Sequence, residues 1–229
     1  MDALRLNLKQ LSACYRMPTT TGVWLSYPLP SYATIYGFLR AICGQTKETE
    51  ESINYKNTLL SVKGTYKTSY FDLQIMHRED LKDRIGKTEP YKVQILYDIN
   101  LEIHIVSDPK RLQLMEHALN NPPFTLSLGR REDLITALSY KRIEIEEIEP
   151  DLDIVNIKAE YPFYLPQLKT NEYGLEGILF NLPKDSYFLR EYNLRRMLYQ
   201  KVYYITQDAL TFIGEGEIHI DKDGRLVWI

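Results

Sequence analysis

Cysteine is scarce in this 229-residue chain, which contains only Cys14 and Cys43. Two cysteines supply neither a disulfide framework nor a four-cysteine metal site. Long apolar runs are also missing, and none approaches the roughly 18–20 residues that span a bilayer. The first residues lack a basic segment followed by an apolar stretch, so a secretory signal is not expected. We therefore expect a cytoplasmic protein that makes no contact with a membrane.

The common signatures of catalytic sites are missing too. The sequence has no H-E-x-x-H motif, no pair of C-x-x-C motifs and no Walker-type glycine loop. Its four histidines, His77, His104, His117 and His219, are far apart in the sequence, and we interpret each as structural or merely exposed. We therefore expect no catalytic residue, no bound metal and no cofactor.

The composition is that of a globular protein, with 44% hydrophobic and 26% charged residues. The net charge of −3 argues against a protein that coats nucleic acid through bulk charge. The charge is uneven, however: residues 1–143 carry a net +4 and the remaining residues a net −7. A basic face in the N-terminal part is therefore still available.

Strand and helix signals follow one another in the first half of the chain. Residues 3–10 alternate between apolar and polar side chains, which predicts a half-buried strand. Ser31 is a good N-cap for a helix that is expected to stop at Gly44. Residues 59–76 and 92–106 predict two long strands with a charged tip between them. Together they predict a β-hairpin, spanning about residues 59–106, that projects beyond the sheet.

A second helix is predicted to start at Asp108-Pro109. Short strands at 125–128 and 142–149 are expected to flank a turn of helix at 132–138. The order β-α-β-β-α-β over residues 3–149 is the ferredoxin-like arrangement, so we predict an α+β domain over residues 1–149. Residues 150–229 are expected to form a mostly β region, with strands near 154–161, 196–206, 210–214, 217–220 and 226–229.

Candidate RNA-binding residues gather after the first predicted strand. Tyr15 offers a ring that stacks on an unpaired base, and Arg16 offers a guanidinium for a phosphate. Hydroxyls follow at Thr19 and Thr20. The alternative, that Tyr15 is a packing aromatic and Arg16 an ordinary surface residue, is equally compatible with the spacing. The predicted helix start adds backbone N–H groups and hydroxyls suited to an anion, at Ser31 and Thr34.

Further candidate cations lie elsewhere in the sequence. Lys63 and Lys67 share one face of the incoming hairpin strand. Arg78 lies near the hairpin tip, where interleaved acidic residues also fit a solvated surface. Arg130 and Arg131 are adjacent at a glycine turn, which suits phosphate contacts, although an arginine that pairs with Glu132 is the ordinary alternative.

Two motifs resemble a known family. One begins at Tyr15-Arg16-Met17-Pro18 and continues at Tyr27-Pro28-Leu29-Pro30-Ser31 through Gly37 and Leu39; the other is Leu128-Gly129-Arg130-Arg131-Glu132. Both resemble the Cas5 family of CRISPR-associated RAMP proteins. The length and the Pro-Leu-Pro-Ser form are most similar to members from type I-B systems. Ala33 departs from the pattern, because a small hydroxyl residue is common there.

The resemblance implies an RNA-binding subunit of a Cascade surveillance complex, active in antiviral defence. Such subunits hold the 5′ handle of the crRNA, and their hairpin, called a thumb, touches the neighbouring backbone subunit. They also contact the large subunit, while target DNA is recognised indirectly through pairing with the guide.

One branch of the family, in type I-C systems, processes the RNA without a metal. This sequence lacks an adjacent Lys-His pair in the corresponding region, so we expect a noncatalytic subunit. Two alternatives remain: a metal-independent endoribonuclease that processes pre-crRNA, and a protein-interaction scaffold that never contacts RNA.

Overall fold

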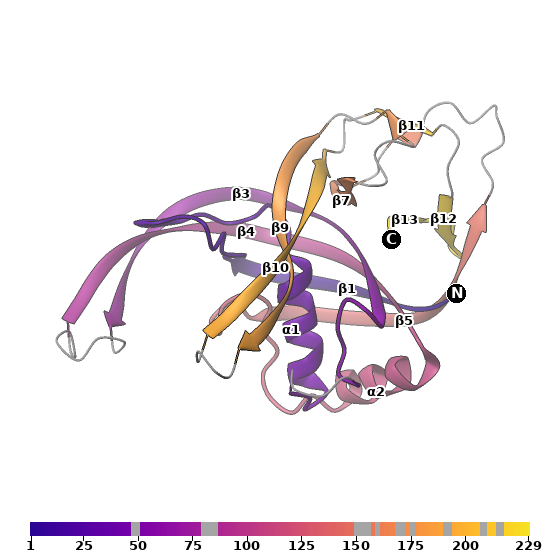
Figure 1. Ribbon diagram of the computed structural model, residues 1–229, viewed down its shortest axis with the longest axis horizontal. Helices are drawn as coiled ribbons and strands as arrows, with labels where there is room; N and C mark the ends of the chain where they lie inside the picture. The colour runs from indigo at the N-terminus through magenta and orange to yellow at the C-terminus, as the bar shows by residue number, and fades with distance from the viewer. Residues whose placement is uncertain are drawn as a thin grey trace.

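The computed structural model describes residues 1–46, 51–78, 87–148, 157–158, 161–167, 173–174, 177–189, 194–206, 210–213 and 218–229. Within them the chain is a mostly antiparallel β-sheet protein with two helices (Figure 1). Neither helix has the length and apolar character needed to cross a membrane. The elements are β1 (Asp2–Ala13), β2 (Val23–Trp24), α1 (Tyr32–Ile42), β3 (Thr58–Arg78), β4 (Lys87–Ser107), α2 (Pro109–Asn120), β5 (Ile135–Ile148), β6 (Ile157–Lys158), β7 (Phe163–Pro166), β8 (Tyr173–Gly174), β9 (Ile178–Leu189), β10 (Leu194–Ile205), β11 (Leu210–Ile213), β12 (Ile218–Asp221) and β13 (Leu226–Val227).

The centre of the sheet has the strand order β5-β1-β4-β3, and all neighbours in it are antiparallel. Alternate residues of β1 point to one face, where Leu4, Leu6 and Leu8 are buried. They belong to the same apolar core as residues of α1 and α2, so both helices cover this face (Figure 1). We call the opposite face of these four strands the outer face.

Both helices begin at the predicted caps. The Ser31 hydroxyl accepts a hydrogen bond from the Thr34 N–H, and the Asp108 carboxylate accepts one from the Arg111 N–H. Pro109 occupies the first turn of α2, where a missing N–H costs nothing. α1 ends at Ile42, and Gly44 follows with φ +63°. The helix predictions for these two segments are confirmed.

The long hairpin is also present. β3 and β4 pair from Thr58 and Ser107 at one end to Arg78 and Lys87 at the other. Their distal part extends past the helices as an arm (Figure 1). Most of the predicted charged tip, residues 79–86, lies outside the described residues.

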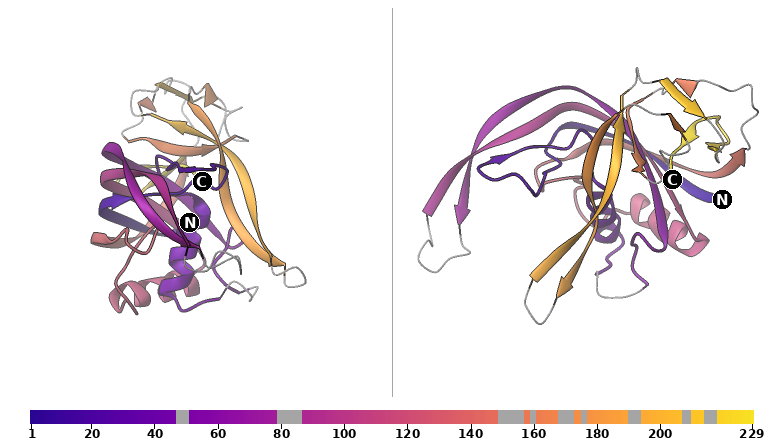
Figure 2. Two further views of the ribbon diagram at one scale, coloured as in Figure 1. Left: turned by 90° about the vertical axis from the view of Figure 1, so that its left-hand side faces the viewer. Right: turned by 45° about the horizontal axis from the view of Figure 1, so that its top comes forward.

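Segments after residue 150 extend both edges of the same sheet. β7, β10 and β9 continue it beyond β3, whereas β12 and β13 continue it beyond β5. The boundary predicted at residue 150 lies outside the described residues. β9 and β10 form a second projecting hairpin (Figure 2). The sequence does not predict β9, because this strand contains Pro183 and proline cannot donate a hydrogen bond to a neighbouring strand. A β-bulge between Leu198 and Tyr199 of β10 accommodates the proline.

The helical turn predicted at 132–138 is wrong. β5 begins at Ile135 and pairs along β1, from Ile135 opposite Gln10 to Glu144 opposite Asp2. Pairing with an existing strand satisfies the backbone and outweighs a short helical pattern. The strand predicted at 125–128 is reduced to one bridge, between Ser127 and Leu134.

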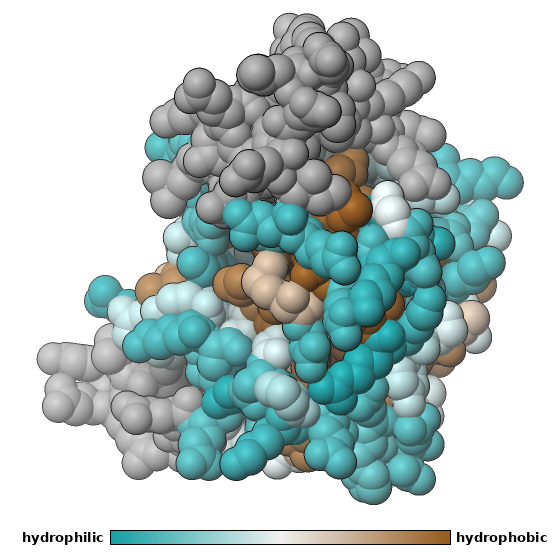
Figure 3. All heavy atoms as spheres, turned by 90° about the vertical axis from the view of Figure 1, so that its right-hand side faces the viewer, coloured by the Kyte–Doolittle hydropathy of each residue, from teal (hydrophilic) through white to brown (hydrophobic). Residues whose placement is uncertain are grey.

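The C-terminal hairpin, β12 with β13, is held to the outer face by buried charges. Arg5 on β1 pairs with Asp221 at 2.7 Å and with Asp223 at 2.7 Å. His104 on β4 lies 3.2 Å from the same Asp221 carboxylate. Figure 3 shows this side of the molecule, where hydrophilic side chains surround a small apolar patch.

Lys63 belongs to this arrangement, which corrects its assignment as an RNA-binding residue. The side chain is 7% exposed, and its ammonium lies 2.7 Å from the Glu102 carboxylate. It also donates to the Leu226 carbonyl at 2.8 Å, while Arg225 pairs with Glu102 from the other side. A buried lysine whose ammonium is held by these acceptors is not available to a phosphate.

His104 makes the stability of the fold depend on pH. Burial, with the Lys63 and Arg5 charges, lowers the pKa of His104 to about 4, although the hydrogen bond to Asp221 acts the other way. Between pH 6.5 and 4 the His104 imidazole is therefore protonated in the unfolded chain but not in the folded chain. Stability falls as the pH falls through this window, by roughly 3 kcal/mol in total.

We expect urea denaturation to show this loss between pH 7 and pH 4.5, and H104Q to remove most of it. The variant H117Q, which changes an exposed histidine on α2, is the control and should retain the slope. An equal slope in wild type and H104Q would contradict the assignment. Asp221 does not interfere, because hydrogen bonds from the Arg225 backbone, His104 and Arg5 outweigh its burial and hold its pKa below 3.8.

Candidate nucleic-acid interface

A groove of about 440 Å³ runs along α1. Its walls come from the loop after β1, from residues 124–129 and from the β9/β10 hairpin. Residues of both sequence motifs meet in it, although they are distant in the chain. The described lining consists of Arg16, Pro18, Ser31, Ala33, Thr34, Gly37, Phe38, Ala41, Phe124, Ser127, Gly129, Pro183 and Met197.

Arg16 supplies the positive charge of the groove. Its side chain is exposed and forms no ion pair with another described residue. The guanidinium carbon lies 3.9 Å from the ring centroid of Trp24, and Trp24 in turn packs against Tyr91 of β4 at 5.9 Å between centroids. This cation–π contact restricts the guanidinium without neutralising it, so Arg16 is positioned for an anion.

The start of α1 contributes polar groups to the same groove. Ser31 is buried, and its hydroxyl forms a hydrogen bond with the Thr34 hydroxyl at 2.9 Å. Thr34 is half-buried and faces the groove with the first turn of the helix, whose free N–H groups favour an anion. One turn later, a Cβ placed on Gly37 would meet no atom within 4 Å. The glycine is therefore not required for packing, and it leaves the groove open.

Tyr15 does not lie in the groove, which corrects its prediction as a stacking platform. The residue is 1% exposed, and its hydroxyl donates to the Gln10 carboxamide oxygen at 2.5 Å. Its backbone N–H donates to the Ser26 hydroxyl at 2.9 Å. Burial raises the pKa of the Tyr15 phenol well above its usual range. The packing alternative is the correct one, because no face of the ring reaches solvent.

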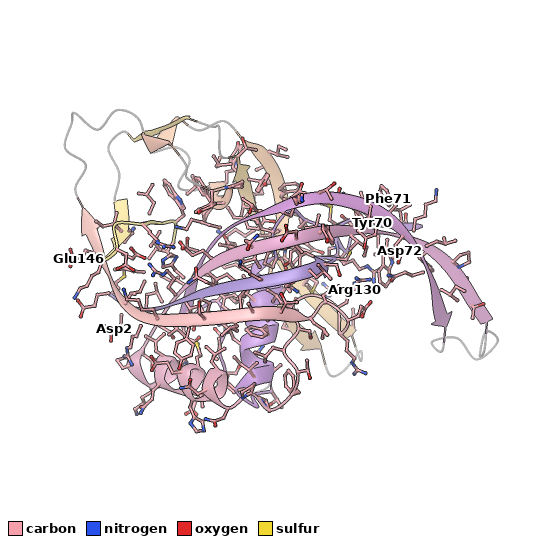
Figure 4. The ribbon with its side chains drawn as sticks, turned by 180° about the vertical axis from the view of Figure 1, so that it is seen from behind. Asp2, Tyr70, Phe71, Asp72, Arg130 and Glu146 are labelled. Carbon is pink, nitrogen blue, oxygen red and sulfur yellow. The ribbon has the colours of Figure 1, made fainter. Side chains whose placement is uncertain are left out.

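Arg130 is not a free phosphate-binding group either. Its Nη2 lies 2.7 Å from the Oδ1 atom of Asp133, and its Nη1 lies 3.0 Å from Glu132. Nη1 also donates to the Gln74 side chain at 3.0 Å, at the base of the arm (Figure 4). Arg130 therefore pairs with Glu132, as the ordinary alternative predicted, and its stronger partner is the fully buried Asp133.

Asp133 joins the two motifs. Its Oδ2 atom accepts hydrogen bonds from the Cys14 N–H at 3.1 Å and from the Arg130 N–H at 2.8 Å. Gly129 lies beside it with φ +113°, and a Cβ there would come within 2.7 Å of the same Oδ2. Only glycine fits this turn. The Asp133 carboxylate thus fixes the turn that brings Gly129 to the groove.

The remaining predicted residues lie outside the groove. Thr19 is exposed, and the Thr20 hydroxyl donates to the Met17 carbonyl at 3.0 Å. Lys67 on β3 and Arg131 in the turn are both exposed. Arg78 pairs with Lys87 through its backbone, and its side chain lies outside the described part of the chain.

Sequence reasoning missed several residues of this site. Trp24 carried one signal, since a tryptophan near a surface arginine often forms a cation–π pair. Asp133 directly follows the second motif but was read as part of a helix. Phe124, Pro183 and Met197 had no signal, because only the tertiary fold brings them to α1.

The groove is suited to binding. None of its described lining residues is a histidine, cysteine, aspartate or glutamate. The nearby Cys14 is buried, and burial raises the pKa of its thiol to about 11, so it is a thiol at neutral pH. An exposed guanidinium, hydroxyls, helix N–H groups and apolar walls together suit a phosphate with an attached ring.

Comparison with known proteins gives three findings. A family model described as CRISPR-associated protein (Cas_Cas5) matches residues 3–198. No curated protein matches the chain in sequence. The solved structures that are similar in fold include a chain from a structure titled CRISPR RNA-guided surveillance complex and the crystal structure of a CRISPR protein from Archaeoglobus fulgidus.

The first of these two chains is 14% identical, with a TM-score of 0.56 and 90% of each chain covered. The second is 13% identical, with a TM-score of 0.50, and covers 99% of this chain and 98% of its own. At this level of identity the likeness shows a shared fold.

The Asp133 contact gives a stability prediction. D133A leaves Arg130 partly buried without its main partner, so we expect the free energy of unfolding to fall by about 3–5 kcal/mol. E132A removes the other partner, whose side chain is 59% exposed, and should cost less than about 1 kcal/mol. Urea denaturation of both variants measures the difference, and similar losses would show that Asp133 does not hold the turn.

Proposed function

The chain belongs to the CRISPR-associated Cas5 family, and we propose that it is a noncatalytic RNA-binding subunit of a Cascade-type effector complex. In this proposal the groove along α1 holds the 5′ handle of the crRNA. The observation that carries it is the convergence of Arg16, Thr34 and Gly129, from both motifs, on one groove with a free positive charge.

The groove offers a partner for each part of a nucleotide. Arg16 pairs with a phosphate, and the first turn of α1 donates hydrogen bonds to the next. Phe124, which is 46% exposed, supplies the stacking ring that Tyr15 does not. Gly37 allows the backbone of the RNA to approach the helix closely.

The arm is proposed as the thumb that contacts the backbone subunit. It exposes apolar side chains on both faces, with Phe71, Leu73 and Ile75 on one face and Tyr70 on the other. Figure 4 labels Tyr70, Phe71 and Asp72 on it. Exposed apolar groups at this density mark a protein interface. Contact with the large subunit and indirect recognition of target DNA complete the proposal.

We also propose that residues 2–148 form a ferredoxin-like domain of the RAMP type. The strand order β5-β1-β4-β3, with α1 after β1 and α2 after β4 on one face, supports it. The two-residue β2, which pairs with β4 in parallel, is an addition to that pattern.

The first test concerns Arg16. R16E should weaken binding of the 5′ handle RNA by about tenfold or more. It should also lower the slope of log affinity against log salt concentration by about 1, which corresponds to the loss of one phosphate contact. W24L, which removes only the ring beneath the guanidinium, should weaken binding by about two- to fivefold. Fluorescence anisotropy over a salt series measures both effects.

K110E is the matched control, because Lys110 is an exposed cation of α2 outside the groove. If R16E and K110E bind RNA equally well, the groove is not the RNA site and the interaction-scaffold alternative gains. Specific cleavage of repeat RNA by the purified protein in EDTA would overturn the noncatalytic assignment.

The second test concerns the arm. The double variant F71D/L73D should reduce co-purification with the backbone subunit by about tenfold or more, because interface anchors dominate binding energy. Its thermal midpoint and RNA binding should not change, since both side chains are exposed. L114D, which charges an exposed leucine on α2, is the control. Normal assembly of F71D/L73D would exclude this face of the arm as the interface.

A further inference from the structure

The outer face of the sheet contains a hollow of about 470 Å³. It lies on the side opposite the helices and therefore opposite the α1 groove. The C-terminal hairpin covers one part of the outer face and leaves this part open. The lining residues are Asn7, Leu8, Lys9, Gly64, Thr65, Asn100, Leu101, Glu102, Ala137, Leu138, Ser139, Tyr161 and Arg225.

Strand register places the side chains of the hollow in two rows. Lys9 lies between Ala137 on β5 and Asn100 on β4, and Asn100 is opposite Thr65 on β3. Cross-strand neighbours of this kind are about 5 Å apart. Two residues further along the strands, the second row consists of Ser139 on β5, Asn7 on β1 and Glu102 on β4.

Side-chain size explains why a hollow forms. The third row, which contains Arg5 and His104, is filled by the Asp221 carboxylate of the C-terminal hairpin. In the first two rows the positions on β5 hold the small side chains of Ala137 and Ser139, and the β3 position of the first row holds Thr65. The rim is completed by Tyr161, which is 40% exposed, and by Arg225.

The charges in the hollow favour an anion. Glu102 is its only acidic residue among those described, and it is paired with both Lys63 and Arg225. Lys9 is exposed and makes no ion pair with another described residue. An anionic group therefore meets an uncompensated ammonium and no free carboxylate.

Polar side chains in the hollow are unsatisfied by the protein itself. Asn7, Asn100, Thr65 and Ser139 make no side-chain hydrogen bond with another described residue. Carboxamides of asparagine recognise the edges of nucleobases, and hydroxyls suit ribose oxygens. Tyr161 adds a partly exposed ring for stacking. A volume of about 470 Å³ lies within the range of small-ligand sites.

We propose that this hollow is a second binding site, specific for a nucleoside monophosphate unit. Lys9 pairs with its phosphate, Asn7 and Asn100 bind the edge of its base, and Tyr161 stacks on the base. The inference does not depend on the α1 groove, which lies on the other face. The unit is either a free nucleotide or one nucleotide of an RNA strand, and both present the same groups.

The test is isothermal titration calorimetry of the full chain with AMP at low salt. We expect one site per chain, with K9A and N100A each weakening binding about tenfold, because each loses a hydrogen bond or ion pair to the ligand. K56A, which changes an exposed loop cation, and K110A, which changes an exposed cation of α2, should leave AMP binding unchanged. Thermal melts establish that the four variants remain folded.

A single-stranded oligoadenylate then identifies the source. If K9A weakens binding of the oligonucleotide as much as binding of AMP, the unit is part of a strand. If K9A weakens binding of AMP alone, the ligand is a free nucleotide. Both results support the site. No AMP binding at millimolar concentration, or binding that K9A and N100A do not affect, would overturn it. So would loss of AMP binding in R16A, because the nucleotide would then occupy the α1 groove.

Discussion

One buried carboxylate sets the shape of the proposed RNA groove. Asp133 receives hydrogen bonds from the loop after β1 and from the turn before β5, through residues 119 positions apart in the case of Cys14. Gln10 reinforces the junction, since its carboxamide donates to the Asp133 and Leu128 carbonyls and accepts from Tyr15. Without this junction, neither Arg16 nor Gly129 has a defined place beside α1. Both sequence motifs thus build the groove and also line it, with Arg16, Thr34 and Gly129 among the residues that face it.

The groove and the arm are mechanically joined. Arg16 stacks on Trp24, and Trp24 packs against Tyr91, which belongs to the β4 strand of the arm. Arg130 makes a second connection, because it bonds both Asp133 and Gln74 on β3. These two connections would hold the proposed RNA contact and the proposed subunit contact at a fixed spacing. Figure 4 shows Arg130 beneath the base of the arm, far from Asp2 and Glu146 at the other end.

On the outer face, the C-terminal hairpin divides the sheet into a covered and an open part. The covered part is charged and buried, and Arg5, Lys63, Glu102, His104 and Asp221 pair with one another there, although the Arg5 Nε and His104 Nδ1 atoms are buried without a hydrogen-bond partner among the described residues. The open part has equally polar side chains without partners. The charges of the covered part are paired with one another, whereas the exposed Lys9 ammonium of the open part forms no ion pair with another described residue, and this contrast is the reason to assign a ligand to the open part.

The sequence by itself determined the local elements: the alternation of β1, the caps Ser31 and Asp108, and the β3/β4 hairpin. These depend on neighbours within a few residues, which a sequence displays directly. It also identified the family through motifs whose residues it could not place. Tyr15, Lys63 and Arg130 were all read as ligands for RNA, yet each is engaged by groups distant in the chain: Gln10 and Ser26, Glu102, and Asp133. Only the tertiary structure decided which cations stay free, because burial and pairing depend on strand register and on the return of the C-terminal hairpin, and neither is encoded locally.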